Sequence, residues 1–333
     1  MFHNPTASTY QHTTPSTNPS VEPFHRSLPD YAVTPLIPLP DLAQQLGIGH
    51  ILLKDESARL GLPAFKILGA SWAIQVALTK KLSLPTTATL DELGAAARKE
   101  GVELYLGVKA VIFVPDFMDR ATQEKIRGEG ATVVVVDGDY DFSIEKAREE
   151  AEKEKGGMLV MDVSWEGYEE IPEYVVQGYI TMLTETDKQL TSMSLPPLTH
   201  AIAAVGVGSW AQAVTSHYKA SSLPQPATVI TVEPDTAASL KTSLEKGKIT
   251  PISTGHTICN GMNCGTTSTT AWEVLRKGVD GIRNGPCGAA TMTALKRVCE
   301  DGKMKETLGL DETSVVVLFS TEGARDYIIP FGA

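Results

Sequence analysis

The sequence predicts an α/β protein with two doubly wound parallel-sheet domains, and three observations support this. Short, wholly apolar runs at residues 110–114, 133–136 and 315–319 have the length and composition of buried strands. Segments of helical length separate such runs, as expected for parallel sheets covered by helices on both faces. The chain has 333 residues, enough for about two domains of roughly 150 residues each.

The first predicted elements follow a polar N-terminal stretch. Residues 1–30 are rich in Ser, Thr, Pro, Asn and His and hold few large aliphatic side chains. Burial cannot offset their ordering entropy, so a flexible N-terminal arm is expected. An apolar stripe that includes Leu68, Trp72 and Val76 predicts a helix over residues 66–81. The other expected helices of this half are 41–46, 91–100, 119–128 and 141–155, and the strands are 50–54, 110–114, 132–136 and 158–161.

The alternation continues in the second half of the chain. The expected helices are 173–186, 210–219, 236–246, 269–277 and 289–300, and the expected strands are 201–205, 228–232 and 314–319. The strands are largely apolar, and the first two are shortly followed by a helix. This series predicts the second α/β unit.

Charge and hydropathy restrict the partners. Twenty-nine basic and 40 acidic residues give a formal net charge of −11, which repels nucleic acid and anionic lipid surfaces. The apolar runs are far shorter than the ~20 residues that span a bilayer. The N-terminal stretch contains no secretory signal pattern. We therefore expect a cytoplasmic protein that binds neither nucleic acid nor membrane.

Cysteine and histidine spacings offer no metal site. The four cysteines lie in the last quarter of the chain and match no zinc-ligand pattern, so reduced, mostly buried thiols are expected. His200, His217 and His256 form no metal spacing or triad either.

A glycine-rich turn, GVGSWA at residues 206–211, joins a predicted strand to a helix. Backbone N–H groups in such a turn and the helix N-terminus favour a bound phosphate. The string also satisfies G-x-G-x-x-A, and Glu233 ends the next strand where a dinucleotide-binding unit holds a ribose hydroxyl. Because any strand-to-helix turn favours glycine, the phosphate, dinucleotide and purely structural interpretations stay open at this point.

Lys66 stands among the apolar residues Phe65, Ile67 and Leu68. If its side chain faces inward, poor hydration lowers the pKa of the ammonium, and a neutral amine becomes a nucleophile toward an aldehyde. A lone lysine in apolar company more often extends its charged end to the surface. The longer strings around Lys66 favour the first interpretation.

Seven strings together resemble the diaminopropionate ammonia-lyase family. They are KDESAR at 54–59, AFKILG at 64–69, DVSWEGY at 162–168, GVGS at 206–209, VEPDTA at 232–237, GMNCG at 261–265 and STEG at 320–323. The resemblance implies the tryptophan-synthase-β-like fold of fold type II pyridoxal-phosphate enzymes, with an incomplete smaller domain. It also implies a large cofactor-binding domain over 31–75 and 166–333, a smaller α/β domain over 76–165, and a homodimer.

The resemblance implies a site with pyridoxal 5'-phosphate as the cofactor. The residues expected to bind it are Lys66, covalently, with Gly206, Val207, Gly208 and Ser209 at the phosphate and Ser320 at the pyridine nitrogen. A neutral hydroxyl at that nitrogen suits β-elimination better than transamination. Asp162 is expected to remove the Cα proton of L-2,3-diaminopropionate, which then loses its β-amine and yields pyruvate and ammonia. From the residues alone, Asp162 could equally cap a helix.

The chain departs from the family at two joins. Family members carry a TDGNHG string before the strand at 110–114, with the asparagine beside the cofactor ring and the turn at the substrate carboxylate. Here Glu103-Leu104 runs directly into Tyr105-Leu106-Gly107, so a strand and most of a helix are absent. A second join at 278–282 lacks a further strand and helix. Because the family uses an aspartate of the missing turn for the D-isomer, surviving activity should favour the L-isomer.

Three functions remain open from the sequence. The first is the lyase, with serine or threonine as fallback substrates. The second is a catalytically impaired isoform or pseudoenzyme of the family, since the missing turn supplies contacts of a preorganised site. The third is a dinucleotide-dependent oxidoreductase, which relies on the turn at 206–211 and on Glu233 alone.

Overall fold

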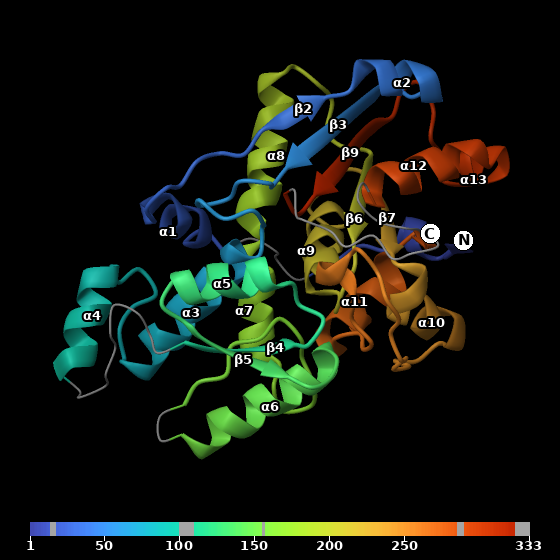
Figure 1. The fold of residues 1–333 in the computed structure, drawn as a ribbon. Coiled ribbons are helices and arrows are strands. Elements are labelled where there is room, and N and C mark those ends of the chain that lie inside the picture. The colour runs from blue at the N-terminus through green and yellow to red at the C-terminus, as the bar shows by residue number, and fades with distance from the viewer. Residues whose placement is uncertain (14–17, 100–109, 155–156, 285–289, 324–333) are drawn as a thin grey trace. The chain divides into compact units, whose positions relative to one another are not determined.

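The computed structural model describes residues 1–13, 18–99, 110–154, 157–284 and 290–323 (Figure 1). The chain divides into two compact units. The large unit consists of Met1–Trp72 and Asp162–Ala333, and the small unit is Ala73–Met161.

A seven-stranded sheet with the order β1-β8-β7-β6-β9-β3-β2 forms the centre of the large unit. Its strands are β1 Phe2–His3, β2 Leu36–Pro38, β3 His50–Asp55, β6 His200–Ala204, β7 Thr228–Glu233, β8 Gly281–Asn284 and β9 Val315–Ser320. The five strands from β8 to β3 are parallel, and β1 and β2 are antiparallel edges. Asp55 pairs with Ser320, so β3 and β9 end side by side at the carboxyl edge of the sheet.

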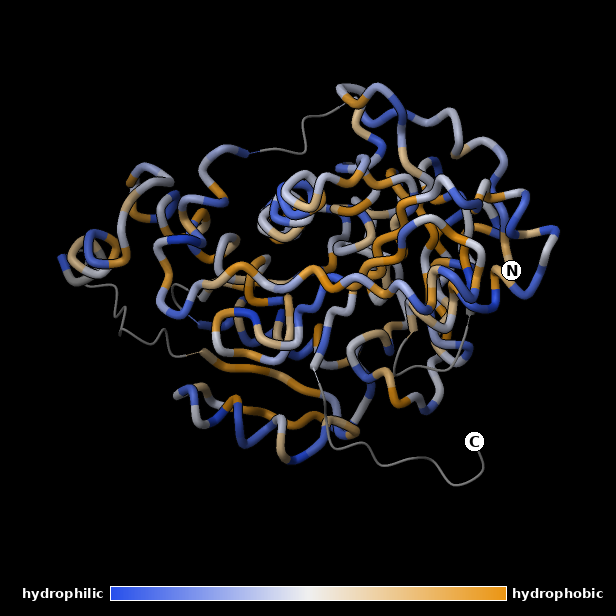
Figure 2. Tube along the Cα trace, turned by 90° about the horizontal axis from the view of Figure 1, so that it is seen from above, coloured by the Kyte–Doolittle hydropathy of each residue, from blue (hydrophilic) through white to orange (hydrophobic). Residues whose placement is uncertain are grey.

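Helices cover both faces of this sheet. They are α1 Val21–Ser27, α2 Pro40–Leu46, α7 Glu170–Gly178, α8 Ile180–Ser192, α9 Ser209–Tyr218, α10 Ser239–Lys246, α11 Thr269–Gly278, α12 Ala290–Glu300 and α13 Gly302–Thr307. Three short 3-10 turns, η1 Ala7–Thr9, η2 Asp235–Ala237 and η3 Asn260–Met262, complete the unit. One core cluster includes Leu295 and Val298 of α12, and the other includes Ala211 of α9 and Leu275 of α11. In the trace coloured by hydropathy, several extended segments are largely hydrophobic, whereas hydrophobic and hydrophilic residues alternate along the outer coiled segments (Figure 2).

The small unit holds a two-stranded parallel sheet among its described residues. Its elements are α4 Leu90–Lys99, β4 Val111–Pro115, α5 Arg120–Gly128, β5 Thr132–Val136 and α6 Tyr140–Lys153, and α3 Ile67–Lys81 enters it from the large unit. Asp119 and Asp139 cap α5 and α6 by accepting hydrogen bonds from backbone N–H groups. The strand expected at 158–161 is not formed, because this partly buried run has no pairing strand in the described unit.

The N-terminal residues are packed, so the expectation of a flexible arm was wrong for the described part of 1–30. β1 pairs with β8, and Val21 and His25 of α1 are fully buried. His25 Nε2 donates to the Leu68 carbonyl at 2.9 Å, and its Nδ1 accepts from the Thr181 hydroxyl at 2.7 Å. Hydrogen bonds between buried polar side chains and specific partners help to offset the conformational entropy lost when this segment becomes ordered, which its composition alone does not reveal.

Two further expectations needed correction. The helix expected over 173–186 is two helices, α7 and α8, which meet at Tyr179. Cys259 is disulfide-bonded rather than reduced, whereas Cys264 is a buried free thiol. The sequence also gave no sign of β1, β8, α1 or α13, which are short or polar.

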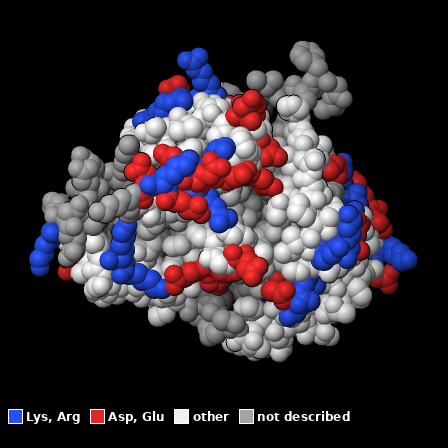
Figure 3. Space-filling view, turned by 90° about the horizontal axis from the view of Figure 1, so that it is seen from below, with Lys and Arg blue, Asp and Glu red and all other residues white. Residues whose placement is uncertain are grey.

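Two features of the described residues concern possible partners: the distribution of surface charge and the character of the helices. Acidic and basic side chains are interspersed on the described part of the face in Figure 3. Within the described residues, no helix combines the length and apolar character needed to cross a bilayer.

Candidate active site

A cavity of about 370 Å³ lies at the carboxyl ends of β3, β6 and β9 in the large unit. Every residue of the predicted pyridoxal-phosphate site lines it: Lys66, Asp162, Gly206, Val207, Gly208, Ser209 and Ser320. Ligands of parallel α/β sheets bind outside the carboxyl ends of the strands, and this volume falls in the range of ligand pockets. Four segments far apart in sequence therefore meet around one space.

The chain after β3 places Lys66 near the end of β9. The N–H of Glu56 donates to the Ser320 carbonyl at 2.9 Å, and that of Phe65 donates to the Thr321 carbonyl at 3.2 Å. Segment 56–65 therefore lies against the exit of β9. Lys66 follows at once, and its carbonyl accepts from the Ala70 N–H at 3.0 Å, which makes it part of the first turn of α3.

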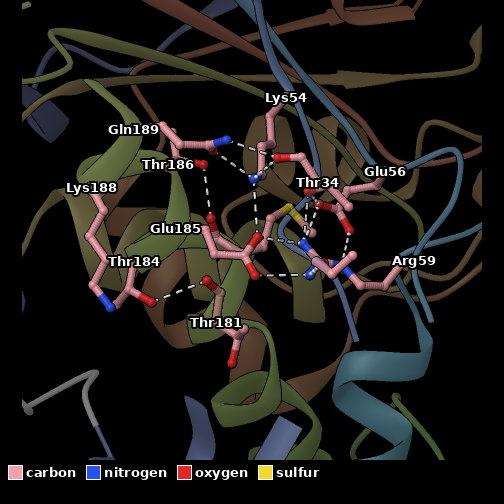
Figure 4. A network of polar contacts seen from close by, with 12 residues as sticks. Thr34, Lys54, Glu56, Arg59, Thr181, Thr184, Glu185, Thr186, Lys188 and Gln189 are labelled. Carbon is pink, nitrogen blue, oxygen red and sulfur yellow. Dashed lines mark hydrogen bonds and ion pairs between the residues drawn. The ribbon is translucent and has the colours of Figure 1, made fainter. Parts of the chain in front are cut away.

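A buried ionic network involves residues of this segment (Figure 4). Arg59 contacts the carboxylates of Glu56 and Glu185, each at 2.7 Å, and Lys54 lies 3.1 Å from Glu185. Burial raises the pKa of Glu185, but hydrogen bonding and charge from Arg59 outweigh this and hold it below its usual range. Two cations and two carboxylates balance, so the KDESAR string is a structural anchor for the loop that leads to Lys66.

The turn between β6 and α9 approaches its neighbours closely. Gly208 has φ of +106°, and a Cβ there would lie 2.9 Å from the Cβ of Ala271. A Cβ on Gly206 would lie 3.1 Å from the Cys264 sulfur. The turn therefore requires glycine for conformation and space. The first N–H groups of a helix lack intrahelical partners, so the start of α9 favours an anion at the cavity.

Lys66 and Asp162 form an ion pair at the cavity, with Nζ 3.4 Å from Oδ2. The charge of Asp162 raises the pKa of Lys66 above its usual range and outweighs desolvation, which lowers it. The expected lowering of this pKa was therefore wrong. The lysine side chain is 46% accessible because it extends into the cavity, so its apolar sequence neighbours are not its main surroundings.

Asp162 is not the N-cap of the helix that follows it. The next helix, α7, begins at Glu170. The Ser209 hydroxyl donates to the backbone carbonyl of Asp162, which ties the glycine turn to this acid. The following residues form a small turn in which the rings of Trp165 and Tyr168 stack at 4.5 Å.

Glu233 has a different role from the one the dinucleotide interpretation requires. Its carboxylate is fully buried and accepts hydrogen bonds from the N–H groups of Leu240 at 2.8 Å and Lys241 at 2.9 Å. Burial raises its pKa to about 8 despite these bonds. Glu233 therefore binds the first turn of α10, and its oxygens are already engaged.

Comparisons with known proteins agree with this geometry. The family model described as pyridoxal-phosphate dependent enzyme matches residues 28–284. A diaminopropionate ammonia-lyase of Salmonella typhimurium is 35% identical over 278 residues, which cover 76% of this chain and 68% of the relative. The chain belongs to the diaminopropionate ammonia-lyase family of pyridoxal-phosphate-dependent enzymes. The Escherichia coli K12 member is 31% identical over 349 residues, covering 91% of this chain and 87% of its own.

Solved structures of this family share the fold. The Escherichia coli diaminopropionate ammonia-lyase in complex with an aminoacrylate-PLP azomethine reaction intermediate has a TM-score of 0.78 and 29% identity, with 94% of this chain and 91% of that chain covered. The complex of the same enzyme with D-serine has a TM-score of 0.80 and 27% identity, with coverages of 96% and 93%. The fold is therefore that of fold type II pyridoxal-phosphate enzymes.

One of the expected joins lies outside the described residues, and the other falls between α11 and β8. The join at Glu103-Leu104 falls in the undescribed range 100–109. At the second join, α11 is followed directly by β8 at Gly281. The alignment with the Escherichia coli family member spans 349 positions, more than the 333 residues of this chain, so it includes positions that the chain lacks.

Pyridoxal phosphate is the cofactor of this family member, and the described residues fit it. The glycine turn leaves no room for a Cβ and is followed by a helix N-terminus, which suits a phosphate. A primary amine, Lys66, lies on the same cavity, as an aldehyde cofactor requires. Ser320 supplies a neutral hydroxyl at the end of β9.

Tyr179 and Glu322 are among the polar residues of the cavity that sequence reasoning missed. Glu322 lies within the STEG string but was assigned no role. A Cβ on Gly261 would lie 2.1 Å from its Oε1, so that glycine makes room for the carboxylate. Tyr179 lies at the junction of α7 and α8, outside the seven family strings, and only the fold reveals it.

Proposed function

We propose that this chain catalyses the pyridoxal-phosphate-dependent α,β-elimination of 2,3-diaminopropionate to pyruvate and ammonia. The observation that carries the proposal is that Lys66, Asp162 and the glycine turn line one cavity in a chain of this family. Two relatives of this chain are named diaminopropionate ammonia-lyases, from Salmonella typhimurium and Escherichia coli.

The proposed cofactor contacts follow from the positions of the residues. Lys66 would hold the aldehyde carbon of the cofactor through its amine, and Ser320 would lie at the pyridine nitrogen. The N–H groups of Gly206, Val207, Gly208 and Ser209 would bind the phosphate, helped by the dipole of α9. When bound, pyridoxal phosphate stabilises the negative charge that forms at the substrate Cα.

Asp162 is the proposed base for the Cα proton. Its carboxylate lies 3.4 Å from Nζ of Lys66, on the cavity that would hold the substrate. Once the proton is removed, the Cβ–N bond breaks and ammonia leaves. Hydrolysis of the resulting unsaturated amine releases pyruvate and a second ammonia, so one water is consumed for each diamino acid. Preference for the L-isomer is part of this proposal.

A catalytically impaired family member is the second candidate. The absence of the family's TDGNHG string from the sequence favours it, because that turn is expected to bind the substrate carboxylate. The oxidoreductase is disfavoured, since Glu233 is engaged by α10. We further propose a cytoplasmic homodimer with a small amino-acid substrate, and domain limits at 31–75 with 166–333 and at 76–165.

Absorbance and product formation test the proposal together. The chain mixed with pyridoxal phosphate should develop a visible band that borohydride abolishes and that Lys66→Ala lacks. L-2,3-Diaminopropionate should then yield pyruvate, detected by coupling to lactate dehydrogenase. A coloured protein that releases no pyruvate would support the impaired alternative, and a colourless folded protein would refute cofactor binding at Lys66.

A further inference from the structure

Tyr179 is a buried polar residue of the cavity to which the proposed mechanism gives no role. It is 1% exposed, and it lines the same cavity as Lys66 and Asp162. Within the described part of the chain, no hydrogen bond involves its hydroxyl. A phenol hydroxyl that lacks a protein partner and lies on a cavity can donate to a molecule bound there.

Packing fixes where the ring lies. Its centroid is 4.9 Å from that of Phe65 and 5.6 Å from that of Trp210, which it meets edge to face. A Cβ on Gly69 would lie 2.8 Å from both Cε1 and Cζ of the phenol, so its hydroxyl-bearing end lies against Gly69. These contacts leave the ring little freedom to turn.

The position of Gly69 places the hydroxyl near the cofactor lysine. Gly69 follows Lys66 by three residues in the first turn of α3, and residues three apart share one face of a helix. The phenol contacts that face. Burial, and then the charge of Asp162, raise the pKa of Tyr179 above its usual range, so the hydroxyl keeps its proton. It is a donor rather than a base.

We propose that the Tyr179 hydroxyl donates a hydrogen bond to an oxygen of the molecules bound in the cavity, and is a ligand-binding residue of the active site. The acceptor is an oxygen of the cofactor or the carboxylate of the amino-acid substrate. The proposal rests on the proposed function.

Tyr179→Phe tests this cleanly, because it removes the hydroxyl and keeps the ring that packs on Phe65, Trp210 and Gly69. Tyr218→Phe is the matched control, since Tyr218 is a buried tyrosine that does not line the cavity. Two dissociation constants are measured by absorbance: pyridoxal phosphate on the purified chain, and L-2,3-diaminopropionate on the loaded protein. Melting temperatures of both variants are recorded.

We expect Tyr179→Phe to weaken one of the two equilibria by about tenfold or more, as for a hydrogen bond to a charged acceptor. The equilibrium that changes identifies the acceptor, and Tyr218→Phe should stay within twofold of the wild type. Both equilibria within twofold in Tyr179→Phe would overturn the proposal. A wild-type chain that binds both molecules but forms no pyruvate would contradict the proposed function and leave this result interpretable.

Gly69→Ala is a second variant that keeps the hydroxyl but displaces it. The added methyl would lie 2.7 Å from Cγ1 of Val175 and 2.8 Å from the phenol ring, so both side chains must shift. The same equilibrium as in Tyr179→Phe should weaken. Unchanged binding in Gly69→Ala would contradict the placement of the hydroxyl.

Discussion

Removal of Arg59 should destabilise the large unit strongly. Its guanidinium lies 2.7 Å from both Glu56 and Glu185, and all three side chains are fully or almost fully buried. Arg59→Ala would leave two buried carboxylates with Lys54 as the only cation in this network. Breaking a buried pair from one side costs about 3–5 kcal/mol. At about 2–4 °C per kcal/mol for a unit of this size, the melting temperature should fall by about 6–20 °C.

Urea denaturation and thermal melts of the cofactor-free chain measure this loss. Arg26→Ala is the control, because Arg26 is 48% exposed and its ion pair with Glu22 lies at the surface. Such a pair contributes about 1 kcal/mol or less. The control should therefore melt within a few degrees of the wild type.

The pH dependence distinguishes lost charge pairing from lost packing. In the wild type the pKa of Glu185 is held below its usual range, so its contribution is present at neutral pH and is lost as pH falls through the folded value. In Arg59→Ala this pKa should rise instead, and protonation relieves the buried charge. The deficit should therefore narrow from pH 7 to pH 5. A loss below about 1 kcal/mol, or a deficit that is independent of pH, would refute this account of the network.

Three other changes test the site and the fold. Gly208→Ala should lower the free energy of unfolding by about 1–3 kcal/mol and weaken cofactor binding, because φ is +106° and the added Cβ would lie 2.9 Å from that of Ala271. Melts and cofactor titrations measure both effects. Gly302→Ala is the control, because a Cβ there would meet nothing within 4 Å. Asp162→Asn should lower pyruvate release by about 10²–10⁴-fold while the cofactor colour remains, and unchanged turnover would exclude Asp162 as the base. The pKa of Glu233 is raised to about 8, so wild-type stability should fall as pH rises from about 5 to 8, and Glu233→Gln should flatten that slope in urea titrations.

The elements and the site were predictable where local pattern decides them. Lys66 and the turn at Gly206–Ser209 stood out because the strings around them resemble those of the family, and apolar runs identified the strands that bury both faces. The sequence of β8, Gly281–Asn284, is too short and polar to be recognised as a strand. It forms one because β7 and β1 pair with it on either side.

Long-range contacts explain the predictions that were wrong. The pKa of Lys66 depends on Asp162, which is 96 residues away, and no sequence neighbour reveals that carboxylate. His25 is buried because Thr181 and Leu68 satisfy its ring, which composition cannot show. Tyr179 becomes a cavity residue only when α7 and α8 meet beside Gly69.

The central claim is that Lys66 binds the cofactor covalently in the cavity formed with the glycine turn. Borohydride reduction of the chain loaded with pyridoxal phosphate, followed by proteolysis and mass spectrometry, tests it directly. We predict one pyridoxyl-modified peptide, which contains Lys66 and is lost when inorganic phosphate competes at high concentration. Modification of a different lysine, with Lys66 unmodified, would contradict the account.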